Sequence, residues 1–450
     1  MLEFQYEMPY EIYSSKDIER YAKKLIGKRF IDIQVPENED TKALGSPGNK
    51  GHLGQYLERF YFLYEPNSSK APDFLEAGVE LKVSPLKRLK NNQLRAKERI
   101  VLNIIDFTTI VEEKWEESSF LHKNGLLLLV FYLHEEGKER LDNVIRMVTL
   151  WDYGEKDLEI IKQDWHKIVN KIREGKAHEL SERDTLYLGA CPKGVNCGST
   201  REQPFSDELA MQRAFSLKQS YVNSIISRIE DTEPAIATLD DFDTGKTFED
   251  IIREKMSKYQ GMDVQTIHAK VGYGLNPRSK NYYASLAARM LGLKKNKIEE
   301  FEKGDVILKT IRLRRDGMPK ESMSFPYFDY QKIVDEAWES STFLNQLDRR
   351  FFFMVFQYDG QDKLCFKKGM FWGMPYEDMQ EAMSVWEETV KRIKEGRATD
   401  LPRIRDNHVC HVRPHAQSSK DTCETPHGEH VVKKCFWLNA SYLKEQIERS

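Results

Sequence analysis

The sequence is short of features that define several large classes of protein. It has six cysteines in 450 residues, too few for a disulfide framework, so we expect a reducing compartment. Its longest apolar run, Leu126 to Leu133, is far shorter than the roughly 20 residues that span a bilayer. The first residues carry acid where a signal peptide carries base. We therefore expect a cytoplasmic protein that does not associate with membranes.

Neither sign of charge dominates the sequence. It contains 69 Lys and Arg against 72 Asp and Glu, a formal net charge of −3. This balance argues against a protein that coats nucleic acid by bulk charge, so any DNA or RNA contact must come from local patches. With 40% hydrophobic and 31% charged residues, the chain is typical of a globular protein, and its length suits two or three domains.

Several motifs occur twice, in the same order, in the two halves of the sequence. Trp115-Glu-Glu-Ser-Ser-Phe-Leu recurs as Trp338-Glu-Ser-Ser-Thr-Phe-Leu. The segment from Trp165 to Leu180 likewise resembles Trp386 to Leu401. Collinear matches anchored on tryptophan indicate two copies of one domain rather than chance similarity. We predict domains at 1–230 and 247–450, joined by an acidic connector at 231–246.

The residue patterns within each half predict helices, then strands, then helices. Val79–Val83 alternates between apolar and charged residues, which is typical of a strand. The apolar runs Ile100–Ile105 and Leu126–Leu133 are typical of buried central strands, and Met211–Ile226 is predicted to be helical. The expected fold class is α/β, with a mixed sheet flanked by helices and present in two tandem copies.

The segment from Asp73 to Lys82, Asp-Phe-Leu-Glu-Ala-Gly-Val-Glu-Leu-Lys, contains the most informative residues. In a strand Glu80 and Lys82 share a face while Leu81 points into the core, and Asp73 at the preceding turn can place a second carboxylate beside Glu80. Two carboxylates, a backbone carbonyl and waters suit Mg²⁺. Lys82 would orient or deprotonate a water and offset charge on phosphorus, so the pattern favours phosphodiester hydrolysis. Because Glu-x-Lys also occurs elsewhere in the chain, solvated surface charge is the alternative.

The second half lacks most of these acids. When Lys82 is aligned with Lys309, Glu300 and Ile307 take the positions of Asp73 and Glu80. A separate alignment of Lys50–Arg59 with Lys280–Arg289 puts Ala288 opposite Glu58. A magnesium site cannot be built from one carboxylate and an isoleucine. We infer a catalytic N-terminal half and a binding or regulatory C-terminal half.

The order of these motifs resembles the mismatch-repair nicking endonuclease MutH. The resemblance is carried by Gly51-His-Leu-Gly-Gln-Tyr-Leu-Glu58, by Asp73-x6-Glu80-Leu-Lys82 and by Trp115-Glu-x-Ser-x3-His122-Lys123. The two-copy layout is similar to the related type II restriction endonucleases that cut at GATC. The resemblance implies a restriction-endonuclease-like (PD-(D/E)XK) fold in each half. It also implies Mg²⁺-dependent cleavage of double-stranded DNA at GATC that leaves 5′-phosphate ends.

Residue roles follow from the same resemblance. The implied catalytic residues are Glu58, Asp73, Glu80, Lys82 and Lys123, and the implied metal ligands are Asp73, Glu80 and Glu58 with the backbone carbonyl of Leu81. The second half has Gln346 in place of Lys123. In the restriction relatives the second half resembles an effector domain that binds another copy of the site. We therefore expect self-association on DNA, and no nucleotide cofactor.

Candidate DNA-binding residues come from the basic run after the Glu80 strand and from loops implied by the resemblance. The basic run could track phosphates, with a solvated charged hairpin as the alternative. The candidates are Lys50, Lys87, Arg88, Lys90, Lys193, Asn196, Lys218, Arg413, His415 and Asn439.

Two other functions stay open at this point. One is a nicking repair nuclease switched on by a partner protein, and the other is a non-catalytic module that reads the methylation state of DNA. The His- and Cys-rich segment Asn407–Cys435 could also hold structural zinc, since Cys423-x3-His427 has a ligand-like spacing. No paired Cys-x2-Cys accompanies it, so buried thiols and DNA-facing histidines are favoured.

Overall fold

The computed structural model describes residues 8–35, 52–66, 70–194, 199–230, 246–279, 281–293 and 298–449. The chain forms two compact units, one comprising Met1–Leu180 and Thr185–Pro234, the other Ser181–Asp184 and Ala235–Ser450. Of the expected connector 231–246, only Lys246 belongs to the described residues. Within the described ranges, no helix has the length and apolar character needed to cross a membrane.

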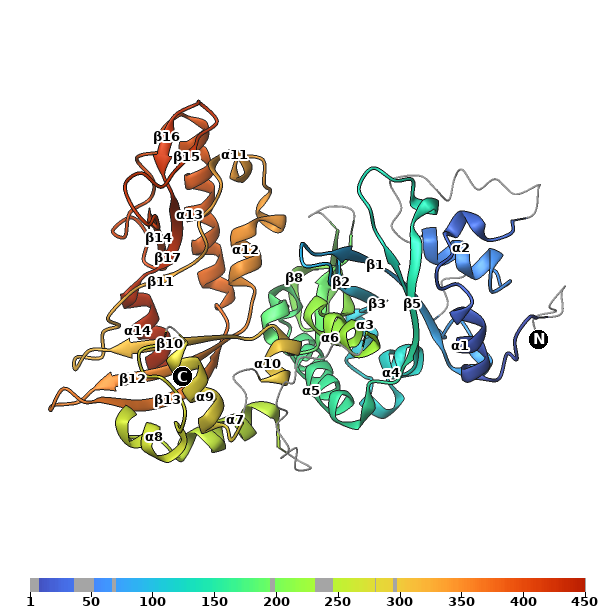
Figure 1. Ribbon diagram of the computed structural model, residues 1–450, viewed down its shortest axis with the longest axis horizontal. Helices are drawn as coiled ribbons and strands as arrows, with labels where there is room; N and C mark the ends of the chain where they lie inside the picture. The colour runs from blue at the N-terminus through green and yellow to red at the C-terminus, as the bar shows by residue number, and fades with distance from the viewer. Residues whose placement is uncertain are drawn as a thin grey trace. The chain divides into compact units, whose positions relative to one another are not determined.

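The first unit is built on a mixed four-stranded sheet of order β2-β1-β4-β5 (Figure 1). Strands β1 and β4 are parallel, while β2 and β5 run antiparallel to their neighbours. A second sheet has the order β3-β9-β6, and β7 and β8 form a hairpin. The elements are α1 (Ser15–Lys23), α2 (His52–Phe60), β1 (Glu80–Arg88), β2 (Leu94–Ala96), β3 (Ile100–Ile104), α3 (Phe107–Ile110), α4 (Ser119–Asn124), β4 (Leu127–Leu133), β5 (Val144–Trp151), α5 (Gly154–Arg173), β6 (Leu188–Pro192), β7 (Thr200–Gln203), β8 (Ser206–Met211), β9 (Arg213–Leu217) and α6 (Gln219–Ile229).

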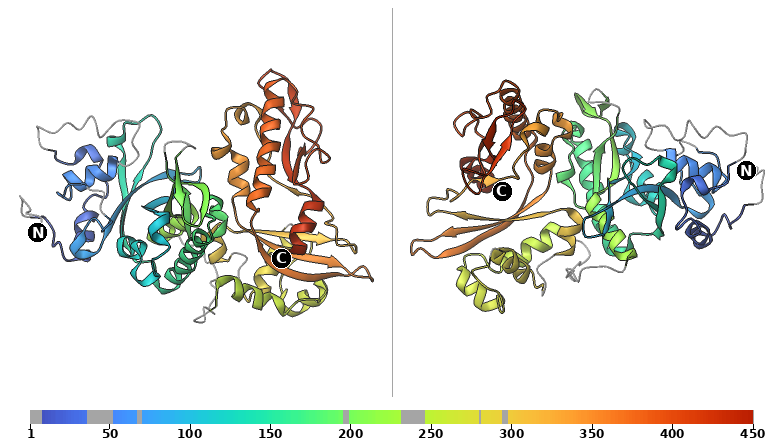
Figure 2. Two further views of the ribbon diagram at one scale, coloured as in Figure 1. Left: turned by 180° about the vertical axis from the view of Figure 1, so that it is seen from behind. Right: turned by 45° about the horizontal axis from the view of Figure 1, so that its top comes forward.

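Helices cover both faces of the four-stranded sheet in this unit. Helices α1 and α2 lie on one face, and α4, α5 and α6 lie on the other side (Figures 1 and 2). Helix α1 begins where the Ser14 hydroxyl accepts a hydrogen bond from the backbone N–H of Asp17 (3.2 Å), and its Ile18 and Ala22 are fully buried. Strand β4 is buried almost along its whole length, as a central strand covered on both faces must be.

The second unit has the same kinds of layers. Its main sheet has the order β10-β12-β13, with β10 parallel to β12, and a second sheet has the order β11-β17-β14. Strands β15 and β16 form a hairpin. The elements are α7 (Phe248–Ser257), α8 (Val264–Val271), α9 (Tyr282–Met290), α10 (Glu299–Gly304), β10 (Ile307–Leu313), β11 (Met323–Ser324), α11 (Tyr330–Ile333), α12 (Thr342–Leu347), β12 (Phe351–Tyr358), β13 (Leu364–Trp372), α13 (Tyr376–Lys394), β14 (Cys410–Pro414), β15 (Thr422–Glu424), β16 (His430–Val432), β17 (Lys434–Leu438) and α14 (Ala440–Arg449).

Equivalent tertiary contacts occur in both units. A tyrosine on the last helix donates a hydrogen bond to an aspartate on the long helix, and a tryptophan on that helix packs against the one in the repeated Trp-Glu motif. The pairs are Tyr221–Asp157 and Tyr442–Asp378, with hydrogen bonds of 3.0 and 2.8 Å, and Trp115–Trp165 and Trp338–Trp386, with ring centroids 5.8 and 5.7 Å apart. The sequence matches therefore correspond to matched structural positions.

Two predicted elements differ from the structure. The run Ile100–Ile105 does not join the β1–β4 sheet, because β3 pairs with β9 in the second sheet. The segment Met211–Ile226 is not one helix: its first part forms β9 and only Gln219–Ile229 is helical. Short apolar runs fit a buried strand and a buried helix equally well, and here pairing of β9 with strands on both sides decides for the strand.

Candidate active site

The candidate site begins at the first residue of β1. Glu80 is almost fully buried, and its Oε1 accepts a hydrogen bond from Lys82 Nζ at 2.6 Å. The two side chains share a face of the strand, as the alternation predicts, and Leu81 between them belongs to the apolar core. A buried carboxylate is thus held beside an ammonium group within one strand.

Asp73 reaches the start of β1 from the turn before it. Its Oδ2 accepts a hydrogen bond from the backbone N–H of Leu81 (2.9 Å), and its own N–H donates to Glu80 Oε2 (3.2 Å). In an extended strand the N–H and C=O of one residue point to the same side, so the Leu81 carbonyl is directed toward the side of Asp73. Strand β2 pairs with β1 only from Leu86 onward, so among the described strands none lies beside Leu81 on this side of β1.

The third carboxylate comes from helix α2. Glu58 is half-buried, and Gly54 lies one turn earlier on the same face of α2, where a Cβ would make an ordinary contact of 3.7 Å with Glu58 Oε1. Burial and, to a smaller extent, the charges of Asp73 and Glu80 raise the pKa of Glu58 to about 7, although Lys82 and Lys123 oppose the rise. The structure thus brings Glu58 into the field of the other two acids.

Lys123, at the end of helix α4, completes the cluster. Its Nζ lies 3.7 Å from Glu80 Oε1, and its side chain is mostly buried. Burial and the charge of Glu80 raise the pKa of Asp73 to about 6, although Lys82, the Leu81 N–H and Lys123 favour its ionised form. All five predicted catalytic side chains therefore come together from α2, the turn before β1, β1 itself and α4.

The carboxylates of the cluster have the donor chemistry of a divalent-cation site. Within the described ranges, however, no group of three or more His, Cys, Asp or Glu side chains is placed so that it could hold a metal ion. Mg²⁺ does not require such a group, since it usually takes one or two carboxylates and shares its remaining positions with water and substrate phosphate. Burial is the main cause of the raised pKa values of Glu58 and Asp73, and the negative charges of the neighbouring acids raise them as well, so a cation beside them would be favourable.

The equivalent positions of the second unit have a different chemistry. Glu80 is the first residue of β1 and pairs with Leu127, while Ile307 is the first residue of β10 and pairs with Phe351. Lys309 is half-buried without that acid, and burial and the charge of Arg349 lower its pKa. The role of Arg349 beside this lysine is not signalled by any motif in the sequence.

The two remaining positions of the second unit that correspond to acids of the first hold an alanine and a glutamate. Ala288 on α9 is fully buried, and Glu300 on α10 is almost fully buried. The two αL residues Gly78 and Asp305 occupy the same place before β1 and β10, with φ of 65° and 54°. The backbone immediately before the two strands is therefore similar, while two of the three carboxylates have no counterpart in the second unit.

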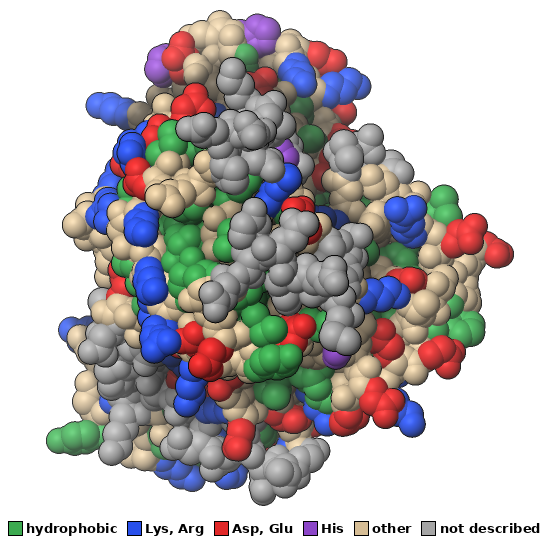
Figure 3. Space-filling model, turned by 90° about the vertical axis from the view of Figure 1, so that its right-hand side faces the viewer, with side chains coloured by type: hydrophobic (Ala, Val, Ile, Leu, Met, Phe, Trp, Pro, Cys, Tyr) green, Lys and Arg blue, Asp and Glu red, His purple; other side chains and the backbone are tan. Residues whose placement is uncertain are grey.

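Most of the described DNA-binding candidates lie at the surface. Lys87, Arg88 and Lys90 are exposed on the β1–β2 hairpin, so the basic run is a hairpin that continues the strand of Glu80. Lys193 is exposed after β6. On the face drawn in Figure 3, basic and acidic side chains are interspersed, with Lys and Arg prominent along one margin, in line with a small net charge. Lys50 and Asn196 lie outside the described residues.

In the second unit Arg413 and His415 are exposed at the end of β14. The Arg413 guanidinium lies 3.7 Å from the centroid of the Trp437 ring, and the His415 ring is 5.6 Å from it, centroid to centroid. A guanidinium stacked on an indole keeps its in-plane donors available while its orientation is restricted.

Two further candidates are buried instead. Lys218 is 7% exposed and its ammonium donates to the carbonyl of Thr185 (2.6 Å). Asn439 is 1% exposed; its amide nitrogen donates to two backbone carbonyls and its oxygen contacts the ring of His411. Both side chains support neighbouring loops and do not face solvent, so we do not assign them to a DNA surface. Residue type and loop position suggested exposure, but neither reports burial.

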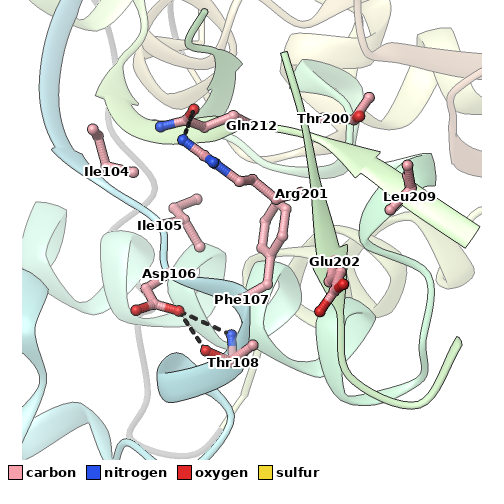
Figure 4. A pocket seen from close by; sticks show the side chains of 10 residues that line it. All are labelled: Ile104, Ile105, Asp106, Phe107, Thr108, Thr200, Arg201, Glu202, Leu209 and Gln212. Carbon is pink, nitrogen blue, oxygen red and sulfur yellow. Dashed lines mark hydrogen bonds between the residues drawn. The ribbon is translucent and has the colours of Figure 1, made fainter. Parts of the chain in front are cut away.

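Two other features of the chain do not contribute to the site. In the His- and Cys-rich segment, His411 contacts Asn439, and His427 contacts the carbonyl of Lys394, so these rings have partners other than a metal. A pocket of about 620 Å³ lies between the end of β3, the start of α3 and the β7–β8 hairpin (Figure 4). Its Arg201 donates to Gln212, and none of the clustered carboxylates lines it.

Comparison with known proteins identifies the family of the chain along nearly its full length. The family model described as DNA mismatch repair enzyme MutH matches residues 62–164 and again 292–383. Type II restriction enzyme Sau3AI from Staphylococcus aureus is 34% identical over 497 aligned positions, which cover 97% of this chain and 99% of that enzyme.

MutH proteins match a smaller share of the chain. The DNA mismatch repair protein MutH of Shewanella woodyi is 29% identical over 199 positions, covering 42% of this chain and 83% of that protein. MutH of Shewanella oneidensis is 27% identical over 207 positions, covering 44% of this chain and 89% of that protein. Because similarity to the restriction enzyme extends along nearly the full length of both chains, this chain belongs to the family of type II restriction endonucleases represented by Sau3AI, which shares its nuclease module with MutH.

Proposed function

We propose that the first unit hydrolyses double-stranded DNA at a Mg²⁺ site made by Asp73, Glu80 and Glu58 with the Leu81 carbonyl. The observation that carries this proposal is the gathering of three carboxylates and two lysines at the open side of β1. When bound there, the ion would polarise the phosphodiester and make a water a better nucleophile.

The lysines of the cluster have their own proposed roles. Lys82 is held at Glu80 by its 2.6 Å hydrogen bond, so its ammonium is positioned to orient the attacking water and to offset charge developing on the phosphate. Lys123, 3.7 Å from the same carboxylate oxygen, would add to this stabilisation from the α4 side. Glu80 holds both ammonium groups in place before the substrate binds. Little reorganisation of these groups is therefore needed during the reaction.

We further propose that the second unit is a copy of the first with a restriction-endonuclease-like fold, and that it binds DNA without cutting it. Matched sheet order, register and buried contacts support common descent of the two units. The absence of an acid at Ile307 and Ala288 supports the loss of cleavage. Exposed Arg413 and His415 support the retention of DNA binding.

The proposed substrate is DNA containing GATC, and its cleavage would leave 5′-phosphate ends. We propose that the protein acts in the cytoplasm. With one acid cluster per chain, cutting both strands requires two chains on the DNA or two successive nicks, so we propose self-association on DNA. The second unit would hold another copy of the site and act as an effector. This specificity is proposed from the resemblance to GATC-cutting restriction enzymes.

Plasmid digestion tests these proposals directly. Adenine-methylated and unmethylated plasmids would be incubated with the purified protein, with and without Mg²⁺, and the ends of the products sequenced. We expect Mg²⁺-dependent linear products with ends at GATC. A partner-activated nicking enzyme, which the MutH similarity favours as second candidate, would not linearise the plasmid when the protein acts alone. If the protein is instead a non-catalytic methylation reader, Glu80→Ala should leave every measurable activity unchanged.

A further inference from the structure

Tyr64 lies between the two segments that supply Glu58 and Asp73. After α2 the chain turns back, and the Tyr64 N–H donates to the carbonyl of Glu58 (3.0 Å). Its ring packs edge-on against Phe74, the neighbour of Asp73, with ring centroids 5.3 Å apart. The Tyr64 backbone is therefore tied to Glu58, and its ring packs on the residue next to Asp73.

The Tyr64 hydroxyl is buried and has no hydrogen-bond partner within the described part of the chain. Two nearby tyrosines behave differently: Tyr10 donates to the carbonyl of Phe62 (2.7 Å), and Tyr61 donates to the carbonyl of Tyr21 (2.8 Å). A buried donor without an acceptor lowers the stability of the fold, so such a group needs an explanation.

The carboxylates of the site are among the groups whose charge acts on the Tyr64 hydroxyl. Burial raises the pKa of Tyr64 well above its usual range, and the charges of Asp73 and Glu58 raise it further, so the hydroxyl stays protonated. It can therefore only act as a neutral donor or acceptor. Asp73 uses Oδ2 to accept from Leu81, and within the described residues its Oδ1 accepts no hydrogen bond.

We propose that Tyr64 is a positioning residue of the nuclease site, whose hydroxyl donates a hydrogen bond to the Asp73 carboxylate when that site holds a divalent cation. The inference rests on the proposed function of the first unit. A neutral donor can fix the orientation of a ligating carboxylate without competing for the charge of the ion, as supporting hydrogen bonds do at other metal sites. On metal binding the hydroxyl would gain this carboxylate as its partner.

Replacement of this hydroxyl has an unusual expected result. Tyr64→Phe removes a donor without a partner, so the melting temperature of the metal-free full chain should stay the same or rise. Affinity for Mn²⁺, measured by calorimetric titration without DNA, should fall about 3- to 10-fold. Single-turnover cleavage should need correspondingly more Mn²⁺ and approach the wild-type rate at saturation.

Tyr61→Phe is the matched control, because it removes a tyrosine hydroxyl three residues away that has a backbone partner. It should lower the melting temperature and leave Mn²⁺ affinity unchanged. Equal Mn²⁺ affinity in Tyr64→Phe and wild type, or a loss of stability like that of Tyr61→Phe, would overturn the positioning role while leaving the proposed function intact. If the wild-type chain neither binds Mn²⁺ nor cleaves DNA, the proposed function fails, and the inference fails with it.

Discussion

The ammonium of Lys82 lies 2.6 Å from the carboxylate of Glu80, two residues earlier on β1. In β10 the same two positions hold Lys309 and Ile307, so the second lysine is kept without the acid that would orient it. The pairing matters because one carboxylate, Glu80, holds the lysine and is also a proposed ligand of the metal. Replacement of Glu80 would therefore remove a proposed metal ligand and the partner of Lys82 at the same time.

Lys82→Gln should lower the single-turnover rate of DNA cleavage at least 100-fold, with little change in DNA affinity at low salt. The reason is that the side chain acts on the reacting phosphate and water, an effect that commonly amounts to about 3–4 kcal/mol. The measurement is the rate of conversion of supercoiled plasmid at saturating enzyme and Mg²⁺. Lys309→Gln is the matched control and should leave the rate within a few-fold of wild type. Equal losses in both variants would contradict the assignment of catalysis to the first unit.

The metal-free protein should become less stable as pH rises from about 4 to above 7. The pKa values of Glu58 and Asp73 are raised in the folded chain to about 7 and about 6, so the folded state binds more protons than the unfolded state in this range. This loss of stability is absent at pH values below the pKa values of the unfolded chain and complete at pH values above those of the folded chain. After allowance for solvent screening it should amount to about 1–3 kcal/mol.

Calorimetric melting at pH 5 and pH 8 checks this pH dependence. Glu58→Gln should flatten it by making the group neutral throughout, and saturating Mg²⁺ should raise the melting temperature mainly at pH 8. Glu76→Gln, which changes an exposed acid on the turn before β1, serves as the control and should behave like wild type. A wild-type melting temperature that rises steadily from pH 5 to pH 8 without metal is incompatible with these pKa shifts.

The pairing of Glu80 with Lys82 could be predicted from the sequence because strand alternation fixes which side chains share a face, whereas Glu58 and Lys123 were implied by the resemblance to MutH. Glu80 and Lys82 follow from period two alone, whereas the approach of Lys123 depends on where α4 packs, which no local pattern contains. Burial was the main quantity that the sequence did not reveal. Lys218 and Asn439 have the side chains of DNA-reading residues, yet their polar atoms bond to the backbone inside the fold. The hydroxyl of Tyr64 was overlooked for the same reason.

The basic hairpin should contribute affinity but not chemistry. At about 3.3 Å per residue, the eight steps from Glu80 to Arg88 place the exposed Arg88 about 26 Å along the strand from the acid cluster. The triple variant Lys87→Ala, Arg88→Ala, Lys90→Ala should weaken DNA binding and reduce the slope of log affinity against log salt by up to about 0.9 for each phosphate that is no longer neutralised. The single-turnover rate at low salt and saturating enzyme should not change.

Fluorescence anisotropy at several salt concentrations measures this slope. Duplexes that extend different distances from the cleavage site add a second test, since only those long enough to reach the hairpin should distinguish the variant from wild type. As a control, Lys332→Ala changes an exposed lysine on α11 of the second unit, remote in sequence from the candidate segments. An unchanged salt slope in the triple variant would assign the hairpin to ordinary solvated charge.

Arg413→Ala should remove binding of a second duplex while sparing the chemistry of the first unit. The guanidinium is held 3.7 Å from the centroid of the Trp437 ring, so its donors are exposed in a restricted orientation, and one bidentate contact to a base accounts for about 1–3 kcal/mol of discrimination. In a Glu80→Gln background that prevents cutting, titration with labelled GATC duplex should give two duplexes per chain, and one per chain when Arg413→Ala is added. His430→Ala, at an exposed position on β16, is the control.

In the cleavage-competent chain, Arg413→Ala should favour nicked over linear products on a plasmid with a single site, because assembly on DNA is weakened while each acid cluster stays intact. A stoichiometry of one in both proteins would mean that the second unit does not hold DNA in this way.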